Sequence, residues 1–410
     1  MQRKSIGKVL AIGAVAALAV VSLAACSSKK NNGGKSGGLG GGGSSSGGGA
    51  GVNAGKTFKI GFQGALSGDN QQLGINEINS VNLAVEEANA KNDLGFKLAV
   101  LQSDDAGDAT KAPAAAQTLI QDNGVVGVVG PIFSGPTSAT GKAYAAAGLG
   151  LISPSATNAD LTSSGFTTFH RIVPTDNVEG TAAATWLAKK NKKVFVVDDT
   201  SVYGKGVADV VSKTLTAAGV KVTRQGVAAS TQDYGAIAQT VASSGATAMF
   251  YGGYDAQAAL FAKALTSAGY KGISMGGNGV KSTVFTSGSG ASGNGWYFSC
   301  GCLDATASTA SAEAKAFTAA YTKKYNTPPS TYSPEAYDAT NAMIEAYKNA
   351  ASKGPITRAT VEDAIVALDF KGITTQIKFA SNGEVAQATV NLYKQVAGKI
   401  DLVGDIKDQS

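Results

Sequence analysis

The sequence predicts an α/β fold of two lobes, each a doubly wound parallel sheet. Short β-rich runs alternate with Ala-rich helical stretches after residue 57, and the alternation restarts near residue 193. The run Val125 to Val129 is apolar throughout, as expected for a strand buried on both faces. Repeated β–α–β units form parallel sheets with helices on both faces. Two series of such units therefore indicate two lobes.

The first series of elements begins at Thr57. Its first strand leads to a helix whose apolar residues Ile78, Val81 and Val85 share one face. A further helix is entered near Ser134, after the apolar run. We expect strands over 57–62, 96–102, 125–129, 150–153 and 168–173, and helices over 76–91 and 108–121.

The second series repeats this pattern and is followed by a helical block. We expect strands over 193–197, 220–227, 246–251, 272–275 and 295–299, and helices over 205–218, 234–243 and 256–267. The later helices are expected over 312–325, 334–351 and 358–368, and a β-rich tail over 374–379 and 388–395. The late helical block indicates that the chain returns to complete the first lobe.

These elements divide the chain into two lobes joined by crossover hinge strands. We expect lobe 1 over 57–175 and 304–375, and lobe 2 over 176–303 and 376–410. Ligands of such sheets bind outside the carboxyl ends of the strands. In a two-lobed protein these ends can face each other across a cleft that closes by hinge motion.

The N-terminal residues predict where the protein is located. A basic start precedes an apolar run, roughly Val9 to Leu23, which is shorter than the ~20 residues that span a membrane. Cys26 directly follows small residues, which resembles the lipobox of bacterial lipoproteins. We predict a signal peptide over 1–25, a lipidated Cys26, a Gly/Ser-rich linker over 26–56, and a position on the outer face of the cytoplasmic membrane. The alternative is a secreted chain in which Cys26 is an unmodified thiol.

Charge and cysteine content exclude some classes of function. The net charge is +6, and six basic residues precede residue 36, so the remainder is near neutral and nucleic acid is not an expected partner. An extracellular address permits a disulfide between Cys300 and Cys302, with two buried thiols as the alternative. The one histidine, His170, has no Cys/His cluster around it, so we expect no metal and no cofactor.

Polar and small residues follow the predicted strands. They form the segments Gly130–Ser138, Ser153–Asn158, Asp198–Gly204, Tyr251–Asp255 and Gly276–Gly279. Ser and Thr at such positions cap helices, and the open N–H groups of a helix start attract a carboxylate. Each segment alone is compatible with ordinary turn chemistry, but together they predict a binding cleft.

These motifs resemble the branched-chain amino-acid (leucine/isoleucine/valine) type of extracellular solute-binding protein of ABC importers. The resemblance covers nearly all of Thr57 to Leu402. It rests on Lys59-Ile60-Gly61, Ala65-Leu66-Ser67-Gly68, Ser153-Pro154-Ser155-Ala156-Thr157, Tyr203-Gly204-Lys205-Gly206, Tyr251-Gly252-Gly253-Tyr254 and Met275-Gly276-Gly277-Asn278-Gly279-Val280. It implies the periplasmic binding protein type I fold.

The resemblance also implies roles for individual residues. Ser134 matches a serine that binds the amino-acid carboxylate, and Ser155 and Thr157 match residues that contact the ligand. Tyr203 and Tyr254 match aromatic residues of the second lobe. The candidate ligand-binding residues are Ser134, Ser155, Ala156, Thr157, Tyr203, Tyr254, Asp255 and Asn278.

Two positions depart from the family pattern. Asn278 stands where the family commonly has an acid that neutralises the ligand's ammonium group, and Leu73 stands where an aromatic residue often lines the wall. Asp255 or Asp199 could supply the missing charge. Without such an acid, the ligand would be a neutral amide, an aromatic or aliphatic acid, or a nucleobase-like compound.

We therefore expect a monomeric, tethered receptor that captures an amino acid or related small polar solute and delivers it to an ABC permease. An enzyme is not expected: a serine nucleophile needs a base, and His170 lies in a predicted strand. The phosphate-binding motif Gly-x-x-x-x-Gly-Lys-Ser/Thr is missing from the sequence. A sensor for a membrane signalling partner is the alternative, because the fold alone does not decide between the two.

Overall fold

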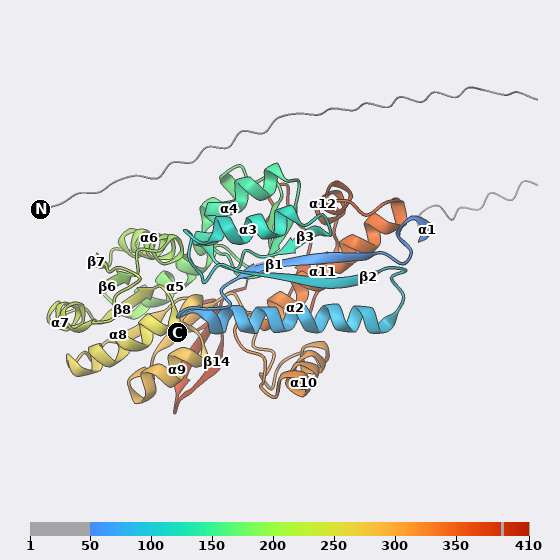
Figure 1. Cartoon of the computed structure of the whole chain (residues 1–410). Coiled ribbons are helices and arrows are strands. Elements are labelled where there is room, and N and C mark those ends of the chain that lie inside the picture. The colour runs from blue at the N-terminus through green and yellow to red at the C-terminus, as the bar shows by residue number, and fades with distance from the viewer. Residues whose placement is uncertain (1–49, 387–388, 410) are drawn as a thin grey trace, which may run out of the picture. The chain divides into compact units, whose positions relative to one another are not determined.

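The computed structural model describes residues 50–386 and 389–409 (Figure 1). By their contacts, residues 47–410 form one compact unit, and the fold belongs to it. The predicted signal peptide, Cys26 and most of the predicted linker lie outside the described residues. Within the described ranges, no helix is both long and apolar enough to cross a membrane.

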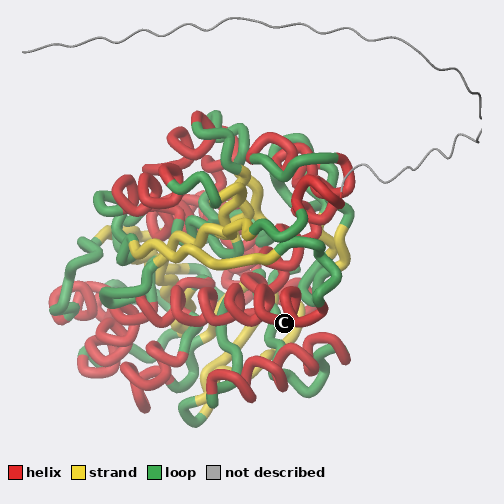
Figure 2. The backbone as a smooth tube through the Cα atoms, turned by 45° about the vertical axis from the view of Figure 1, so that its right-hand side comes forward, coloured by secondary structure: helices red, strands yellow, loops and turns green. Residues whose placement is uncertain are grey.

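The first sheet has five parallel strands in the order β2-β1-β3-β4-β5. The strands are β1 (Thr57–Gly64), β2 (Lys97–Asp104), β3 (Val125–Val129), β4 (Gly150–Ser153) and β5 (Phe169–Arg171). All residues of β3 are buried, as its apolar sequence predicted. Helices cover both faces, so the strands lie between helical layers (Figure 2).

The helices of this sheet come from both ends of the chain. They are α2 (Gln71–Lys91), α3 (Ala112–Gln121), α4 (Ser134–Ala146), α10 (Ala312–Tyr325), α11 (Ser333–Lys353) and α12 (Arg358–Val366). The long helices α2 and α11 pack together, and α11 also lies against β3 and β4. A Cβ at Gly127 in β3 would lie 2.5 Å from the sulfur of Met343, so glycine lets α11 approach the sheet closely. The chain therefore returns to complete its first sheet.

The second sheet has the order β14-β13-β10-β9-β8-β6-β7. Its strands are β6 (Lys193–Asp198), β7 (Lys221–Gly226), β8 (Ala248–Gly252), β9 (Ile273–Gly276), β10 (Tyr297–Cys300), β13 (Asn391–Val396) and β14 (Lys399–Asp405). β6 to β10 pair in parallel, whereas β13 and β14 add an antiparallel edge.

The helices of the second sheet are α5 (Asp176–Lys190), α6 (Val202–Ala217), α7 (Gly235–Ser243), α8 (Asp255–Ser267) and α9 (Thr283–Ser289). In β6, Val194 and Val196 pack with α5 and α6. The alternate residues Phe195 and Val197 belong to the cluster that includes α7 and α8. This alternation buries both faces of the strand.

Some elements differ from the sequence prediction. Helix α5 was not predicted, because its first turn carries Asp176 and Glu179 and its apolar spacing is irregular. Helix α2 begins at Gln71 rather than 76, and β14 was not predicted. The expected strand over 374–379 is only a short pair, β11 (Phe370–Lys371) with β12 (Gln376–Ile377).

The last part of the predicted linker is held on the fold. Asn53 ends the short helix α1 (Ala50–Asn53) and is 2% exposed. Its Nδ2 donates to Gly354 O (2.8 Å), and its Oδ1 accepts from Ile356 N (3.1 Å). These bonds attach the last part of the predicted linker to the segment after α11.

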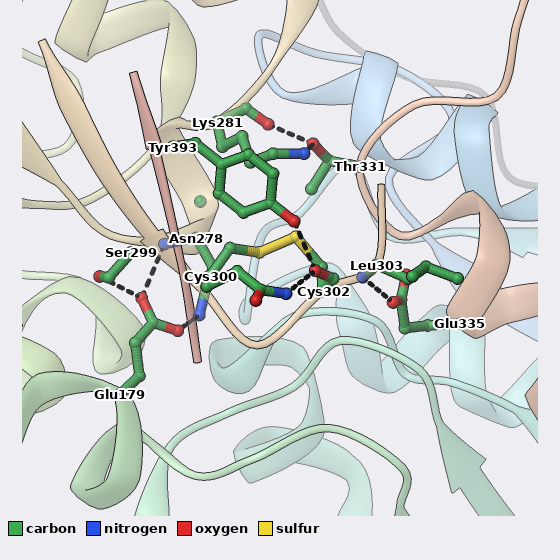
Figure 3. The surroundings of a disulfide bond; sticks show 12 residues. Glu179, Asn278, Lys281, Ser299, Cys300, Cys302, Leu303, Thr331, Glu335 and Tyr393 are labelled. Carbon is green, nitrogen blue, oxygen red and sulfur yellow. Dashed lines mark hydrogen bonds between the residues drawn. A yellow bond between two sulfur atoms is a disulfide. The ribbon is translucent and has the colours of Figure 1, made fainter. Parts of the chain in front are cut away.

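The chain passes between the two sheets after β5, after β10 and after β12. At the second crossing a disulfide joins Cys300 and Cys302, whose Cα atoms are 5.1 Å apart (Figure 3). At the first crossing Arg171 is fully buried and binds Glu384 of the third crossing through Nε (2.9 Å) and Nη2 (2.6 Å). The exact lobe boundaries stay predictions.

The core buries an unusual number of carboxylic acids. Burial raises the pKa of Asp176 to about 8, of Glu179 and Glu335 to about 7, and of Asp338 to about 6. Each of these acids is buried rather than on the surface. A buried carboxyl group is easier to hold in its neutral form.

We expect the protein to lose stability as the pH rises from about 5.5 to about 8.5. The pKa of each buried acid is higher in the folded chain than in the unfolded one, so the folded chain holds more protons in this window, and the free energy of unfolding falls as the pH rises. Thermal denaturation should show a melting temperature lower by about 5 °C or more at the higher pH.

The variant Asp176→Asn removes one titrating group and should show a smaller drop between the two pH values. Asp363→Asn, which changes an exposed acid of α12, is the matched control and should keep the full drop. A melting temperature that rises between the two pH values would contradict this prediction.

Candidate functional site

Strand ends of both sheets meet at a small cavity. Its lining residues are Leu73, Phe133, Ser134, Ser155, Tyr203, Tyr254, Asn278, Gly279 and Tyr332. The loops after β3 and β4 provide one wall, and those after β8 and β9 provide the opposite wall. This is the position in which parallel sheets bind ligands.

The first wall contains the start of α4. Ser134 is the first residue of this helix, and its Oγ accepts from Asn158 N (3.1 Å). The N–H groups of the first helical turn have no partner within the helix, and they attract negative charge. This wall is suited to a carboxylate.

Ser155 connects the first wall to a buried acid. Its Oγ lies 2.7 Å from Ile132 O and 2.9 Å from Oε1 of Glu77 in α2. Burial raises the pKa of Glu77 well above its ordinary value. A serine hydroxyl has a single proton, so it cannot donate to both neighbours at once.

Aromatic rings fill most of the cleft. Tyr254 packs against Phe133 of the opposite wall with ring centroids 4.8 Å apart, and against Tyr203 at 5.3 Å. The hydroxyl of Tyr203 accepts from Gly279 N (3.1 Å). The remaining cavity is about 10 Å³, which holds about one water molecule. A solute the size of an amino acid therefore has to separate Phe133 from Tyr254.

Asn278 on the second wall is held from behind by Glu179 of α5 (Figure 3). The backbone N of Asn278 donates to Glu179 Oε1 (2.9 Å), and its Nδ2 donates to Oε2. Ser299 Oγ donates to the same Oε1 (3.0 Å). Burial raises the pKa of Glu179 to about 7. Three donors therefore fix the carboxylate of Glu179, which lies directly behind Asn278 and does not line the cavity.

The structure places three predicted ligand-binding residues outside the cavity wall. Ala156 N donates to Ser153 Oγ (3.1 Å), and its carbonyl oxygen accepts from Arg171, so its backbone is already bonded. Thr157 is 2% exposed behind the wall. Asp255 is buried at the start of α8, where its Oδ1 accepts from Ala256 N (2.8 Å).

Asp199 does not line the wall either, because its Oδ1 accepts from Ser201 N (2.9 Å) before α6. Neither acid considered as a replacement for the missing charge therefore reaches the cavity.

Sequence reasoning missed Phe133, Tyr332, Glu77 and Glu179. Phe133 directly precedes Ser134 in a strand-end segment, so the same signal could have found it. Tyr332 comes to the cavity only because α11 returns to the first sheet. Glu179 lies in the helix that was not predicted.

The enzymatic alternative gains no support from His170. Its Nε2 pairs with Glu362 Oε1 of α12 (2.9 Å), and its ring packs on Phe379. Among residues 50–386 and 389–409, no cluster of His, Cys, Asp and Glu could hold a metal ion.

Comparison with known proteins gives a consistent result. A sequence profile described as "Periplasmic binding protein" matches residues 57–399. The chain is 30% identical over 349 residues to the Leu/Ile/Val-binding protein of Rhizobium johnstonii, which covers 83% of this chain and 92% of the relative. It is 28% identical over 348 residues to the leucine-, isoleucine-, valine-, threonine- and alanine-binding protein of Pseudomonas aeruginosa, covering 83% and 90%.

Solved structures have the same architecture. The branched-chain amino acid transporter substrate binding protein LivJ of Streptococcus pneumoniae, in complex with isoleucine, matches with a TM-score of 0.77 and 29% identity, over 85% of this chain and 100% of that one. A solute binding protein of R. palustris in complex with benzoate matches with a TM-score of 0.74 at 20% identity, over 85% and 96%, and supports the fold alone. The predicted fold class and the resemblance are thus confirmed, and the chain belongs to the periplasmic binding protein family.

Proposed function

We propose that this chain captures a branched-chain or related aliphatic amino acid between its two walls and delivers it to an ABC permease. The observation that carries the proposal is a cavity lined by strand ends of both sheets, with a helix start on one wall and aromatic rings on the other. The relatives are named for the binding of amino acids of this class, which supports the proposal.

The start of α4 and the Ser134 hydroxyl would hold the ligand's carboxylate. Tyr203, Tyr254 and Leu73 would cover its apolar side chain. Such a ligand touches both walls, and only contacts made in the closed form shift the equilibrium between open and closed forms. The closed form would then be the one that the permease recognises.

The proposal includes a lipid anchor at Cys26 and a monomeric receptor on the outer face of the cytoplasmic membrane. It draws on the lipobox-like residues before Cys26 and the Gly/Ser-rich tract that follows. Such a tract acts as a flexible tether. A tethered receptor stays within reach of its permease.

Calorimetry on the purified protein should show that leucine, isoleucine and valine bind more tightly than asparagine, benzoate or uracil. A ligand with a carboxylate, an ammonium group and an aliphatic body matches the two walls best. Absence of binding by every compound of this panel would refute solute capture, whereas a preference for benzoate would refute the amino acid.

Substitution of Tyr254 by alanine should weaken leucine binding about tenfold or more, because it removes an aromatic face at the centre of the site. Tyr270→Ala is the matched control: it changes a half-buried tyrosine between α8 and β9 that does not line the cavity, and it should bind normally. Equal affinity of the folded Tyr254→Ala variant and the control would remove Tyr254 from the site.

Cys26→Ser should release the protein from the cell envelope into the soluble fraction, since serine cannot carry a thioether-linked lipid. Fractionation of cells that express each form, followed by immunoblotting, measures this. A variant that stays with the membrane to the same extent would rule out an anchor at Cys26.

A further inference from the structure

We propose that Glu179, which does not line the cavity, supplies the negative charge for the ligand's ammonium group by acting through Asn278. The inference rests on the proposed function, in which the ligand is an amino acid. It assigns Glu179 as a positioning and specificity-determining residue behind the wall, with Asn278 as the group that touches the ligand.

The cavity wall itself is neutral. None of its lining residues, all within the described part of the chain, is an aspartate, glutamate, lysine or arginine. An amino acid at neutral pH carries an ammonium group, and burial of this charge is costly unless an opposite charge is near. The counter-charge must therefore come from behind the wall.

Several buried acids lie near the cleft. Asp199 and Asp255 are bonded at the starts of α6 and α8 and do not line the wall. Three others, Glu77, Asp176 and Glu179, differ in their hydrogen-bond partners. Neither carboxyl oxygen of Asp176 has a partner among the described residues. Glu77 faces the Ser155 hydroxyl, whose single proton is also within reach of Ile132 O (2.7 Å). A protonated Glu77 can donate to Ser155 while Ser155 donates to Ile132. Both acids are therefore suited to the neutral form.

Glu179 has the opposite environment. Its two oxygens accept from the backbone and side-chain nitrogens of Asn278 and from the hydroxyl of Ser299. Donors that converge on a carboxylate favour its ionised form. Burial raises the pKa of Glu179 to about 7, and a bound ammonium group would lower it and favour the charge further. Glu179 is thus the acid of the three that is prepared to carry charge.

Asn278 connects this charge to the cavity. Its Nδ2 is used on Glu179, whereas its Oδ1 accepts no hydrogen bond from any described residue. A side-chain amide that donates to a carboxylate becomes a better acceptor at its oxygen, because linked hydrogen bonds polarise one another. The Oδ1 atom can then accept from an ammonium group, with the Glu179 charge directly behind it.

The test is Glu179→Gln in the full-length protein, which keeps the side-chain shape and removes the charge. Calorimetry compares leucine with 4-methylpentanoate, which has the same carbon skeleton and carboxylate but no ammonium group. We expect the variant to bind leucine about tenfold more weakly or worse, and to bind 4-methylpentanoate at least as well as the unaltered protein.

Two further variants make the result specific. Asp338→Asn is the matched control, because Asp338 is a buried acid of α11 that accepts from Ile373 and Thr374 and does not line the cavity. It should leave both affinities unchanged. The double variant Glu179→Gln/Asn278→Asp moves the charge onto the wall and should restore leucine binding.

Equal weakening of both ligands in Glu179→Gln would show a purely structural role and overturn the inference. Unchanged leucine binding in the variant would also overturn the inference, and so would an unaltered protein that prefers 4-methylpentanoate to leucine. In each of these three outcomes the protein still binds a solute, so the proposal of solute capture is retained. If the unaltered protein binds neither compound nor any other solute of the panel, the proposed function fails and the inference fails with it.

Discussion

The buried guanidinium of Arg171 is the interaction on which the first wall of the cleft depends. Besides its two bonds to Glu384, its Nη1 donates to the carbonyl oxygens of Ala156 (3.0 Å) and Asn158 (2.7 Å). One planar group thereby ties the end of β5, the loop that carries Ser155 and the third crossing between the sheets. A fully buried arginine is tolerable only when its charge and its donors are matched in this way. Loss of one partner would leave the loop without a fixed position.

The ends of the strands were predictable from the sequence, because an apolar run followed by small and polar residues indicates where a buried strand ends. The loops with Ser134, Ser155, Tyr254 and Asn278 follow runs that are buried on both faces, and parallel strands bring their carboxyl ends to one edge. Helix α5 was not predictable in the same way. Its acids are buried, so the polar residues that would mark a solvent-facing side of the helix face the interior instead. The place of Tyr332 depends on packing between distant segments.

The acidic side chains near the cleft do not line the cavity but lie behind its wall. Neutral side chains line the cavity, while the acids Glu77, Asp176 and Glu179 stand one layer deeper and are completely buried. The disulfide of Cys300 and Cys302 lies at the crossing near Glu179, which accepts from Ser299, the residue before Cys300 (Figure 3). Tyr393 Oη donates to Cys302 O (2.7 Å), which fixes the crossing to β13. A layer held in this way can keep a carboxylate in place without exposing it to water.

Because Phe133 and Tyr254 contact each other, a bound solute has to replace the contact between the two rings. Each ring already has an apolar partner, so an incoming solute replaces one buried surface by another and gains only the difference between them. A small side chain cannot replace what the two rings lose when they part. The ring pair therefore acts as a minimum-size filter: it favours solutes with a sizeable apolar body over the smallest amino acids, independently of any polar recognition.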